Sequence, residues 1–238
     1  MWLTAFIDLP PTTFEAGAAF WLAATDSSLS SRRGESGEFA SVLPRAGDPW
    51  LRFQRLGDGT ARIHLDLHAD DPDRLSTEAV RLGAALLGRD PVATFASPGG
   101  MVFCVVDSPL SVTAPTPAWP HRSRVDQVCL DIPEPVFDAE AGFWSALLGR
   151  GVTASPTHRE FARLDWQHAD PLKVLLQRCG HDGPVRAHLD LATTDRPAEV
   201  ARLTGLGATP VRDTAWWTTL RDPSGLEFCV TDRVPTQP

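Results

Sequence analysis

Short runs of apolar residues alternate along the chain with longer segments in which apolar and polar positions follow a helical spacing. In the second half, residues 125–131 and 185–191 are short apolar runs that predict strands. Residues 136–148 repeat aromatic and aliphatic side chains at the spacing of one helix face. A second helix is expected after the later of these strands, because Asp195 can cap its first turn and Pro197 fits that turn.

Further short runs complete the second half, and Gly205 or Gly207 can end its second helix. The sequence Asp-Pro-Ser-Gly at 222–225 predicts a turn between the last two runs. The expected strands lie at residues 160–166, 172–178, 209–212, 215–221 and 226–231. The pattern therefore predicts an α+β fold built from two successive βαβββ units.

The same order of motifs occurs in the first half of the chain. The sequence MWLTAFIDLP at 1–10 aligns with RVDQVCLDIP at 124–133, and His-Leu-Asp-Leu at 64–67 recurs at 188–191. The offset between matched positions drifts only from 123 (124 − 1) to 125 (225 − 100). Collinear matches of this kind indicate an internal repeat, so we expect four βαβββ units in the chain.

The repeat divides the chain into two domains. We expect an N-terminal domain at 1–107 and a C-terminal domain at 123–233, followed by a tail at 234–238. Residues 108–122 contain four prolines and are typical of a semi-rigid linker.

Composition and charge exclude several classes of partner. The hydrophobic content of 42% predicts a packed core, and the net charge of -8 argues against a nucleic-acid-binding surface, which needs clustered Lys and Arg. No apolar stretch approaches the roughly 18 residues that a membrane helix needs. Residues 1–10 have the pattern of a strand and not of a signal peptide, so we expect a cytoplasmic protein.

The four cysteines form no CxxC pair, which argues against a zinc knuckle or a thioredoxin-type site. We expect them to be free thiols. The chain also has no convincing phosphate loop, nucleophile elbow or Gly-rich dinucleotide fingerprint, so no nucleotide cofactor is expected.

Three features together resemble the vicinal-oxygen-chelate superfamily, which includes glyoxalase I, bleomycin-resistance proteins and extradiol dioxygenases. They are the His-Leu-Asp-Leu strand, the sequence ARLTGLGA at 201–208 and the sequence RDPSGLEF at 221–228. The resemblance covers nearly the whole chain as two tandem glyoxalase-like domains. It implies that paired units curl into a cup that binds a ligand, often on a divalent metal.

Carried onto this chain, the resemblance implies that Gln127, His188 and Glu227 are the metal ligands. The alternative for His188 is a hydrogen-bonding role inside the cup or contact with the ligand. An imidazole, a carboxylate and an amide oxygen suit Zn, Ni, Mn or Fe. Without a metal, Glu227 is a candidate general base. Asp190 lies on the same strand face as His188 and is expected to orient the imidazole or contact the ligand. Of Trp216 and Trp217, we expect one to line the cup and the other to pack on a helix.

The first half keeps the framework without these ligands. Thr4 and Val102 align with Gln127 and Glu227, so we expect no metal at His64 and interpret this half as a scaffold or an apolar cup. The second half also lacks an acidic residue around 175–177, where glyoxalase I has one, which argues against lactoylglutathione lyase activity.

Two functions remain open from the sequence. One is a metal-dependent lyase, isomerase or dioxygenase that acts on a small oxygen-bearing substrate. The other is a binding protein that sequesters a small organic ligand without turnover, as bleomycin-resistance proteins do. Four units in one chain are compatible with a monomer or a homodimer.

Overall fold

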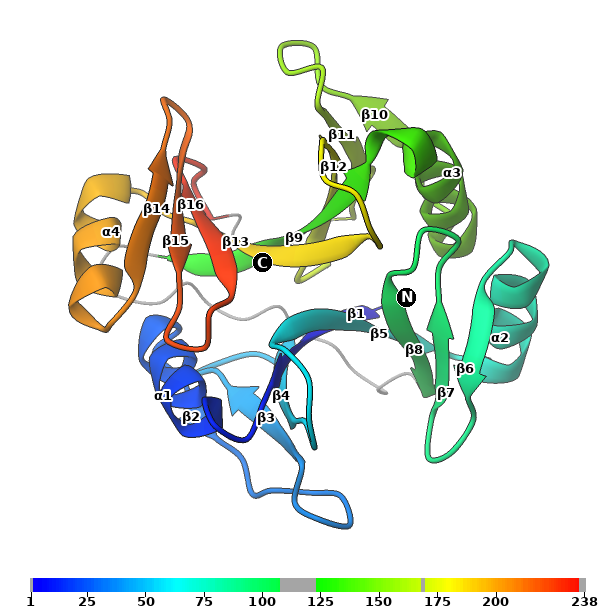
Figure 1. Ribbon diagram of the computed structural model, residues 1–238, viewed down its shortest axis with the longest axis horizontal. Coiled ribbons are helices and arrows are strands. Elements are labelled where there is room, and N and C mark those ends of the chain that lie inside the picture. Colours follow the sequence, from blue (N-terminus) through cyan, green and yellow to red (C-terminus); the bar gives the residue numbers. More distant parts are fainter. Residues whose placement is uncertain (1, 108–122, 168–169, 236–238) are drawn as a thin grey trace.

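The structure, a computed structural model, describes residues 2–107, 123–167 and 170–235. Each half of the chain forms one eight-stranded sheet with two α-helices (Figure 1), which confirms the α+β fold predicted from the repeat. The predicted linker at 108–122 and residues 236–238 of the tail lie outside the described residues. Among the described residues, no helix is long and apolar enough to span a membrane.

The first domain has the strand order β2-β3-β4-β1-β5-β8-β7-β6, with β1 and β5 antiparallel at its centre. Its elements are β1 (Trp2–Leu9), α1 (Phe14–Ala24), β2 (Ser28–Leu29), β3 (Phe39–Leu43), β4 (Leu51–Arg55), β5 (Arg62–Ala69), α2 (Pro72–Arg81), β6 (Ala85–Gly88), β7 (Ala93–Ala96) and β8 (Val102–Asp107).

The second domain repeats this order as β10-β11-β12-β9-β13-β16-β15-β14. Its elements are β9 (Arg124–Pro133), the 3-10 helix η1 (Glu134–Val136), α3 (Phe137–Leu148), β10 (Val152–Ala154), β11 (Phe161–Leu164), β12 (Lys173–Cys179), β13 (Arg186–Ala192), α4 (Arg196–Gly205), β14 (Thr209–Asp213), β15 (Trp217–Arg221) and β16 (Glu227–Thr231). Every strand and helix predicted for this half is present. Asp195 caps α4 as predicted, because its side chain accepts a hydrogen bond from the Ala198 amide.

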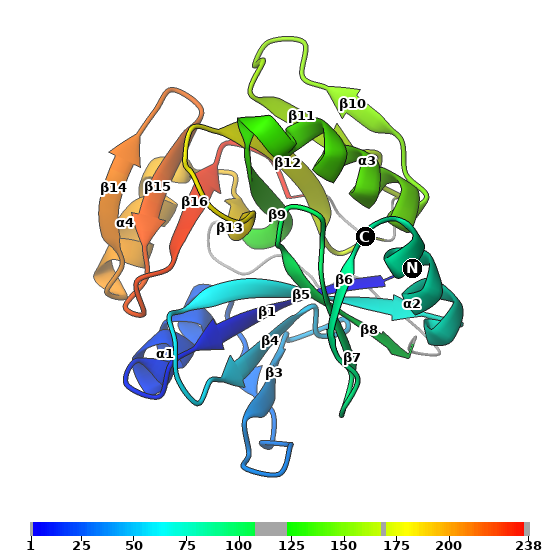
Figure 2. The ribbon, with the colours of Figure 1, turned by 45° about the vertical axis from the view of Figure 1, so that its right-hand side comes forward.

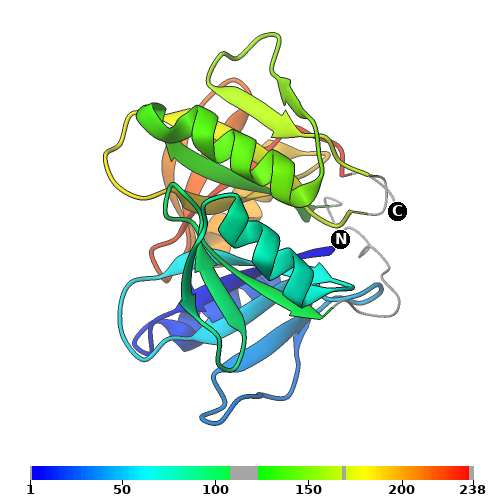
Figure 3. The same cartoon turned by 90° about the vertical axis from the view of Figure 1, so that its right-hand side faces the viewer.

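The central strands of both domains lie in the middle of the molecule, and the helices lie at its periphery (Figure 1). Helix α1 of the first domain packs beside β14–β16 of the second, and α3 of the second packs beside β6–β8 of the first (Figure 2). Helices α2 and α3 contact each other (Figure 3). The two domains share one hydrophobic cluster of buried residues, so they pack as one body.

Two buried tryptophans anchor the domain interface. Trp21 of α1 packs 5.1 Å from Phe228, and Trp144 of α3 packs 5.2 Å from Phe103, measured between ring centroids. Each indole N–H needs an acceptor because it is buried. Trp21 donates to Asp222 in the β15–β16 turn and Trp144 donates to Glu140 in its own helix, both at 2.7 Å.

The two interfaces differ in which element supplies the buried carboxylate. In one interface the helix supplies Glu140 and the facing turn supplies a glycine, whereas in the other the turn supplies Asp222 and the helix supplies a glycine. Glu140 also accepts from the Gly99 amide at 2.7 Å, and a Cβ atom at Gly99 would lie only 2.8 Å from the Glu140 carboxylate. In the other interface, Gly17 aligns with Glu140 (140 − 123), and a Cβ there would lie 3.1 Å from the Cβ of Ser224. In each interface, therefore, one element supplies the buried carboxylate and the glycine of the facing element leaves the space for it.

Candidate functional site

Strand pairing places the predicted site residues in two neighbouring rows of the second sheet. Residues paired on adjacent strands point to the same face of a sheet. Gln127 of β9 pairs with Asp190 of β13, which in turn pairs with Cys229 of β16. The next row contains Cys129 of β9, paired with His188 of β13. These side chains form the floor of the cup in the second domain.

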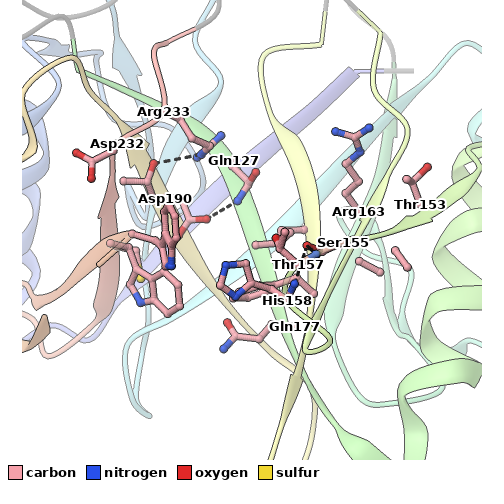
Figure 4. A pocket seen from close by; sticks show the side chains of 18 of the residues that line it. Gln127, Thr153, Ser155, Thr157, His158, Arg163, Gln177, Asp190, Asp232 and Arg233 are labelled. Carbon is pink, nitrogen blue, oxygen red and sulfur yellow. Dashed lines mark hydrogen bonds between the residues drawn. The ribbon is translucent and has the colours of Figure 1, made fainter. Parts of the chain in front are cut away.

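A cavity of about 690 Å³ lies over this floor (Figure 4). Gln127, His188 and Asp190 line its base, and its walls are mostly apolar. Volumes of this size are typical of pockets for small organic molecules. The wall residues include Phe161, Leu175, Trp216 and Trp217.

His188 is held between two carboxylates. Its Nδ1 atom lies 3.0 Å from Asp131 Oδ2, and its Nε2 atom lies 3.3 Å from Asp190 Oδ1. Burial by itself would lower the pKa of His188, but Cys129 and the hydrogen bonds to Asp131 and Asp190 outweigh burial and raise it well above its usual value. The structure therefore favours a protonated ring that donates a hydrogen bond to Asp131 through Nδ1 and forms an ion pair with Asp190 through Nε2.

Gln127 and Asp190 also contact each other, since the Gln127 side-chain amide donates to Asp190 Oδ2 (Figure 4). Burial opposes the charge on Asp190, yet the His188 and Gln127 hydrogen bonds hold its pKa below the usual value. The structure thus brings together three of the predicted site residues.

Glu227 lies apart from this group. It is the first residue of β16, its side chain is 48% exposed, and it forms an ion pair of 2.7 Å with Arg221 on β15. Among the described residues, no cluster of three His, Cys, Asp or Glu donors close enough to share an ion contains Glu227. Cys229 instead joins His188 and Asp190, with its Sγ atom 3.7 Å from His188 Nε2. The predicted set of Gln127, His188 and Glu227 is therefore not assembled in the structure, because the Glu227 carboxylate pairs with Arg221 at the exposed start of β16.

The prediction that one of the two adjacent tryptophans packs on a helix is wrong, because both line the cavity. Trp217 begins β15, whereas Trp216 lies in the preceding turn and is 61% exposed. The ring of Trp216 lies 5.9 Å from that of His158, and the ring of Trp217 lies 5.7 Å from that of Phe161. The aromatic contacts join the two opposite ends of the sheet across the cavity.

Two residues of this site, His158 and Asp131, were not among the site residues predicted from the sequence. His158 lies between β10 and β11, in a segment with no regular pattern. Asp131 had a signal, because it aligns with Asp8 (131 − 123) in the repeated first strand of each domain. A polar residue retained inside an apolar strand in both copies indicates a buried hydrogen-bonding role.

The first domain repeats the polar cluster, but its cup is filled. His64 Nδ1 lies 2.8 Å from Asp8, and His64 clusters with Asp66 and Cys104. Phe6 stands where the second domain has Cys129, and its ring stacks on His64 at 4.5 Å. Arg52 stands where the second domain has Leu175 and lies 5.8 Å from the Phe6 ring. We call Phe6 and Arg52 the plug of the first cup.

His64 is buried and charged. Burial alone would lower its pKa, but the hydrogen bonds to Asp8 and Cys104 and the charges of Asp8 and Asp66 raise the pKa to about 10. The aspartate–imidazole cluster is thus common to both domains, whereas the open cavity above it belongs to the second. All four cysteines are free thiols, as predicted.

A family model described as "Glyoxalase-like domain" matches the chain twice, at residues 4–106 and 127–231. The chain belongs to the glyoxalase-like domain family. This result confirms the resemblance to the vicinal-oxygen-chelate superfamily and the interpretation as two tandem copies. No curated protein is significantly similar to this glyoxalase-like chain in sequence.

Solved structures share the fold at low sequence identity. A mutant of 4-hydroxymandelate synthase from Streptomyces coelicolor has a TM-score of 0.64 and 17% identity, over 97% of this chain and 92% of that one. The Mn(II)-bound glyoxalase from Novosphingobium aromaticivorans has a TM-score of 0.63 and 18% identity, over 96% of this chain and 80% of that one. A 2,3-dioxygenase from Pseudomonas sp. KL28 has a TM-score of 0.63 and 15% identity, over 96% and 90%. At these identities the likeness establishes the glyoxalase-like fold and not an activity.

Proposed function

We propose that the chain binds a small organic molecule in the cup of its second domain. The observation that carries the proposal is the difference between the two cups. Cys129 and Leu175 stand where Phe6 and Arg52 plug the first cup, and a cavity of about 690 Å³ remains above His188. This volume lies within the range of about 300–1,000 Å³ that is typical of small-molecule pockets.

The lining of the cavity favours a ligand with a flat apolar part. Phe161 and Trp217 present aromatic rings to the cavity, and aromatic rings bind planar ligands by stacking. Gln127 and Asp190 at the floor supply a few fixed polar groups, which orient a ligand. A planar organic molecule with one polar edge therefore fits the cup.

Transplanting the plug tests this proposal. The double variant Cys129→Phe, Leu175→Arg copies the first cup into the second and should abolish binding of the fluorescent apolar probe phenylnaphthylamine. The control is the reverse exchange, Phe6→Cys with Arg52→Leu, which leaves the second cup unchanged and should retain binding. Retained binding in a correctly folded plugged variant, checked by circular dichroism, contradicts the proposal.

A second candidate is a metal-assisted lyase, isomerase or dioxygenase, and a specific observation favours it. His188 Nε2, Asp190 Oδ1 and Cys229 Sγ all lie within 4.8 Å of one another. Two of their separations, 3.3 and 3.7 Å, fit neighbouring ligands on a tetrahedral ion with bonds of about 2.0–2.3 Å. Asp131 contacts the far nitrogen of His188, as carboxylates behind metal-bound histidines do.

This donor set fits a divalent ion, with Gln127 as a neighbouring oxygen donor. Such an ion would supply Lewis-acid polarisation of a substrate oxygen, and one relative of the same fold is a Mn(II)-bound glyoxalase. A thiolate among the ligands favours Zn over Mn. The two carboxylates beside His188 stabilise the protonated ring, which cannot bind a metal, so we rank this function second.

Metal analysis decides between the two candidates and also tests the choice of ligands. If the chain is a metal-dependent enzyme, protein incubated with Zn²⁺ and then dialysed should retain one equivalent of Zn²⁺, measured by mass spectrometry. Cys229→Ser and His188→Ala should lose the ion, whereas Glu227→Gln should keep it. Loss of the ion in Glu227→Gln would support the ligand set predicted from the sequence. Protein that retains no metal but still binds phenylnaphthylamine would support the binding function and contradict the metal-dependent one.

A further inference from the structure

A second, larger cavity of about 1200 Å³ adjoins the cup on the side of the first domain. Its lining includes Ile63 and Met101 of the first domain as well as strands of the second. It shares four lining residues with the first cavity, which are Gln177, His188, Trp217 and Cys229. A ligand that occupies the cup can therefore extend into this second cavity.

Arginines dominate the charged lining of the second cavity, which we call the arginine groove. Its five arginines are Arg62, Arg178, Arg186, Arg212 and Arg221, against the carboxylates of Asp131 and Glu227. The groove is thus locally cationic in a chain whose net charge is -8. A local reversal of sign attracts anions to the groove while the rest of the surface repels them.

Three of these arginines are already neutralised by carboxylates. Arg62 pairs with Asp8 at 2.9 Å and Arg221 pairs with Glu227 at 2.7 Å. Arg178 pairs with two carboxylates, both on the rim of the domain. For Arg186 and Arg212, no ion pair is found within the part of the chain that the structure describes. These two guanidinium groups are left to bind an external anion.

Strand register places both side chains on the ligand-binding face. Arg186 pairs with Asp131 and precedes His188 by two residues, so it shares the face of His188. Arg212 pairs with Thr219, which pairs with Cys229 at the floor of the cup. The Arg212 guanidinium also lies 6.0 Å from the ring of Trp217, a residue that lines both cavities.

We infer that the ligand of this protein is an amphipathic organic anion whose apolar body lies in the cup and whose carboxylate or phosphate is bound by Arg186 and Arg212. The inference rests on the proposed binding function of the cup. The floor of the cup sets the orientation, because Asp190 repels an anion there while the arginine groove attracts it. Arg side chains suit this role, since they bind carboxylate and phosphate through two parallel hydrogen bonds.

A matched pair of fluorescent probes separates the two parts of the site. Anilinonaphthalene sulfonate and phenylnaphthylamine share one ring skeleton, but only the first carries an anionic group. We expect the wild-type chain to bind the sulfonate more tightly at low than at high ionic strength, because salt screens exposed charges. The variant Arg186→Ala, Arg212→Ala should weaken sulfonate binding by about tenfold or more and leave phenylnaphthylamine binding within about twofold, because each lost contact is charge-assisted.

The control variant Arg74→Ala, Arg81→Ala removes the same charge from the exposed helix α2 and should leave both probes unchanged. Equal weakening of the sulfonate in the control, or equal weakening of both probes in the groove variant, overturns the inference. The failure of the proposed cup looks different, because then phenylnaphthylamine does not bind the wild type at all. If sulfonate binding still depends on Arg186 and Arg212 in that case, the anion site is supported and the proposed apolar cup is not.

Competition against the bound sulfonate identifies the anion. Naphthalene carboxylate and naphthyl phosphate should each displace it from the wild type. The stronger competitor shows whether the groove prefers a carboxylate or a phosphate. Neutral naphthyl methanol should displace it only weakly. Displacement by the neutral compound at the same concentration as by the two anions contradicts a charge-selective groove.

Discussion

Both ring nitrogens of His188 face carboxylates, Asp131 on one side and Asp190 on the other. A buried charge is tolerated only when it is paired, so the three groups depend on one another. The same arrangement at Asp8, His64 and Asp66 in the first domain shows that the cluster does not require an open cavity. At the residue scale, the difference between the domains is therefore the plug and not the histidine.

The buried charge on His64 predicts a pH dependence of stability. Its pKa is about 10 in the folded protein against about 6.5 when exposed in the unfolded chain. Because the folded pKa is the higher one, the stabilisation is complete below about pH 6.5 and is lost as the pH rises through about 10. At its maximum it is on the order of 5 kcal/mol.

Urea unfolding of the wild type and of His64→Gln at several pH values measures this contribution. The difference in unfolding free energy between the two proteins should shrink steadily from pH 6 to pH 10. A difference that stays constant over this range would mean that His64 is neutral in the folded protein.

The sequence could not decide between Glu227 and Cys229 as the neighbour of His188. The two residues are two positions apart on one strand, so they share a face and the alternation pattern fits both. Only the side-chain contacts select between them, because Cys229 Sγ lies 3.7 Å from His188 Nε2 whereas the Glu227 carboxylate pairs with Arg221. Such contacts depend on the tertiary arrangement. The plug was open to prediction, because the repeat aligns Phe6 with Cys129 directly.

The strands and helices were predictable because the repeat supplied each pattern twice. The strand that sequence patterning missed is β10, which has three exposed residues and no apolar alternation. The helix cap at Asp195 was predictable from local chemistry, and Asp71 caps α2 in the same way. Elements with a local signal were therefore found, and those held only by pairing were not.

Glu140 of α3 carries a prediction at the scale of elements. Its buried carboxylate accepts hydrogen bonds from Trp144, Ser97 and the Gly99 amide, so it joins α3 to the β7–β8 turn of the other domain. Glu140→Ala leaves two buried donors and one partly buried donor unpaired and should lower the unfolding free energy by about 3 kcal/mol.

Glu134→Ala is the matched control, because Glu134 is exposed and pairs with Arg178 on the surface. It should cost less than about 1 kcal/mol. Denaturant titration of both variants provides the comparison. Equal costs would show that Glu140 does not anchor the interface.

At the scale of the whole molecule, the two glyoxalase-like domains share one hydrophobic core and bury each other's aromatic residues. Because unfolding of either domain would expose the core that it shares with the other, we expect the chain to unfold in a single cooperative step. Tryptophan fluorescence and far-UV circular dichroism should therefore report the same denaturation midpoint. Two separated transitions would show that the domains fold independently.

The two domains contribute differently to the cavities. The first domain has a plugged cup and supplies part of the wall of the arginine groove, whereas the second domain supplies the open cup. Under our proposal, the described residues of the two domains thus form one binding site from two copies of the fold.

A crystal structure of the protein with bound phenylnaphthylamine tests this account most directly. We expect the probe to lie in the second cup, between Leu175 and Trp217 and above His188, with none in the first cup beside Phe6. A probe bound in the first cup, or on the outer surface with the second cup empty, would contradict the account.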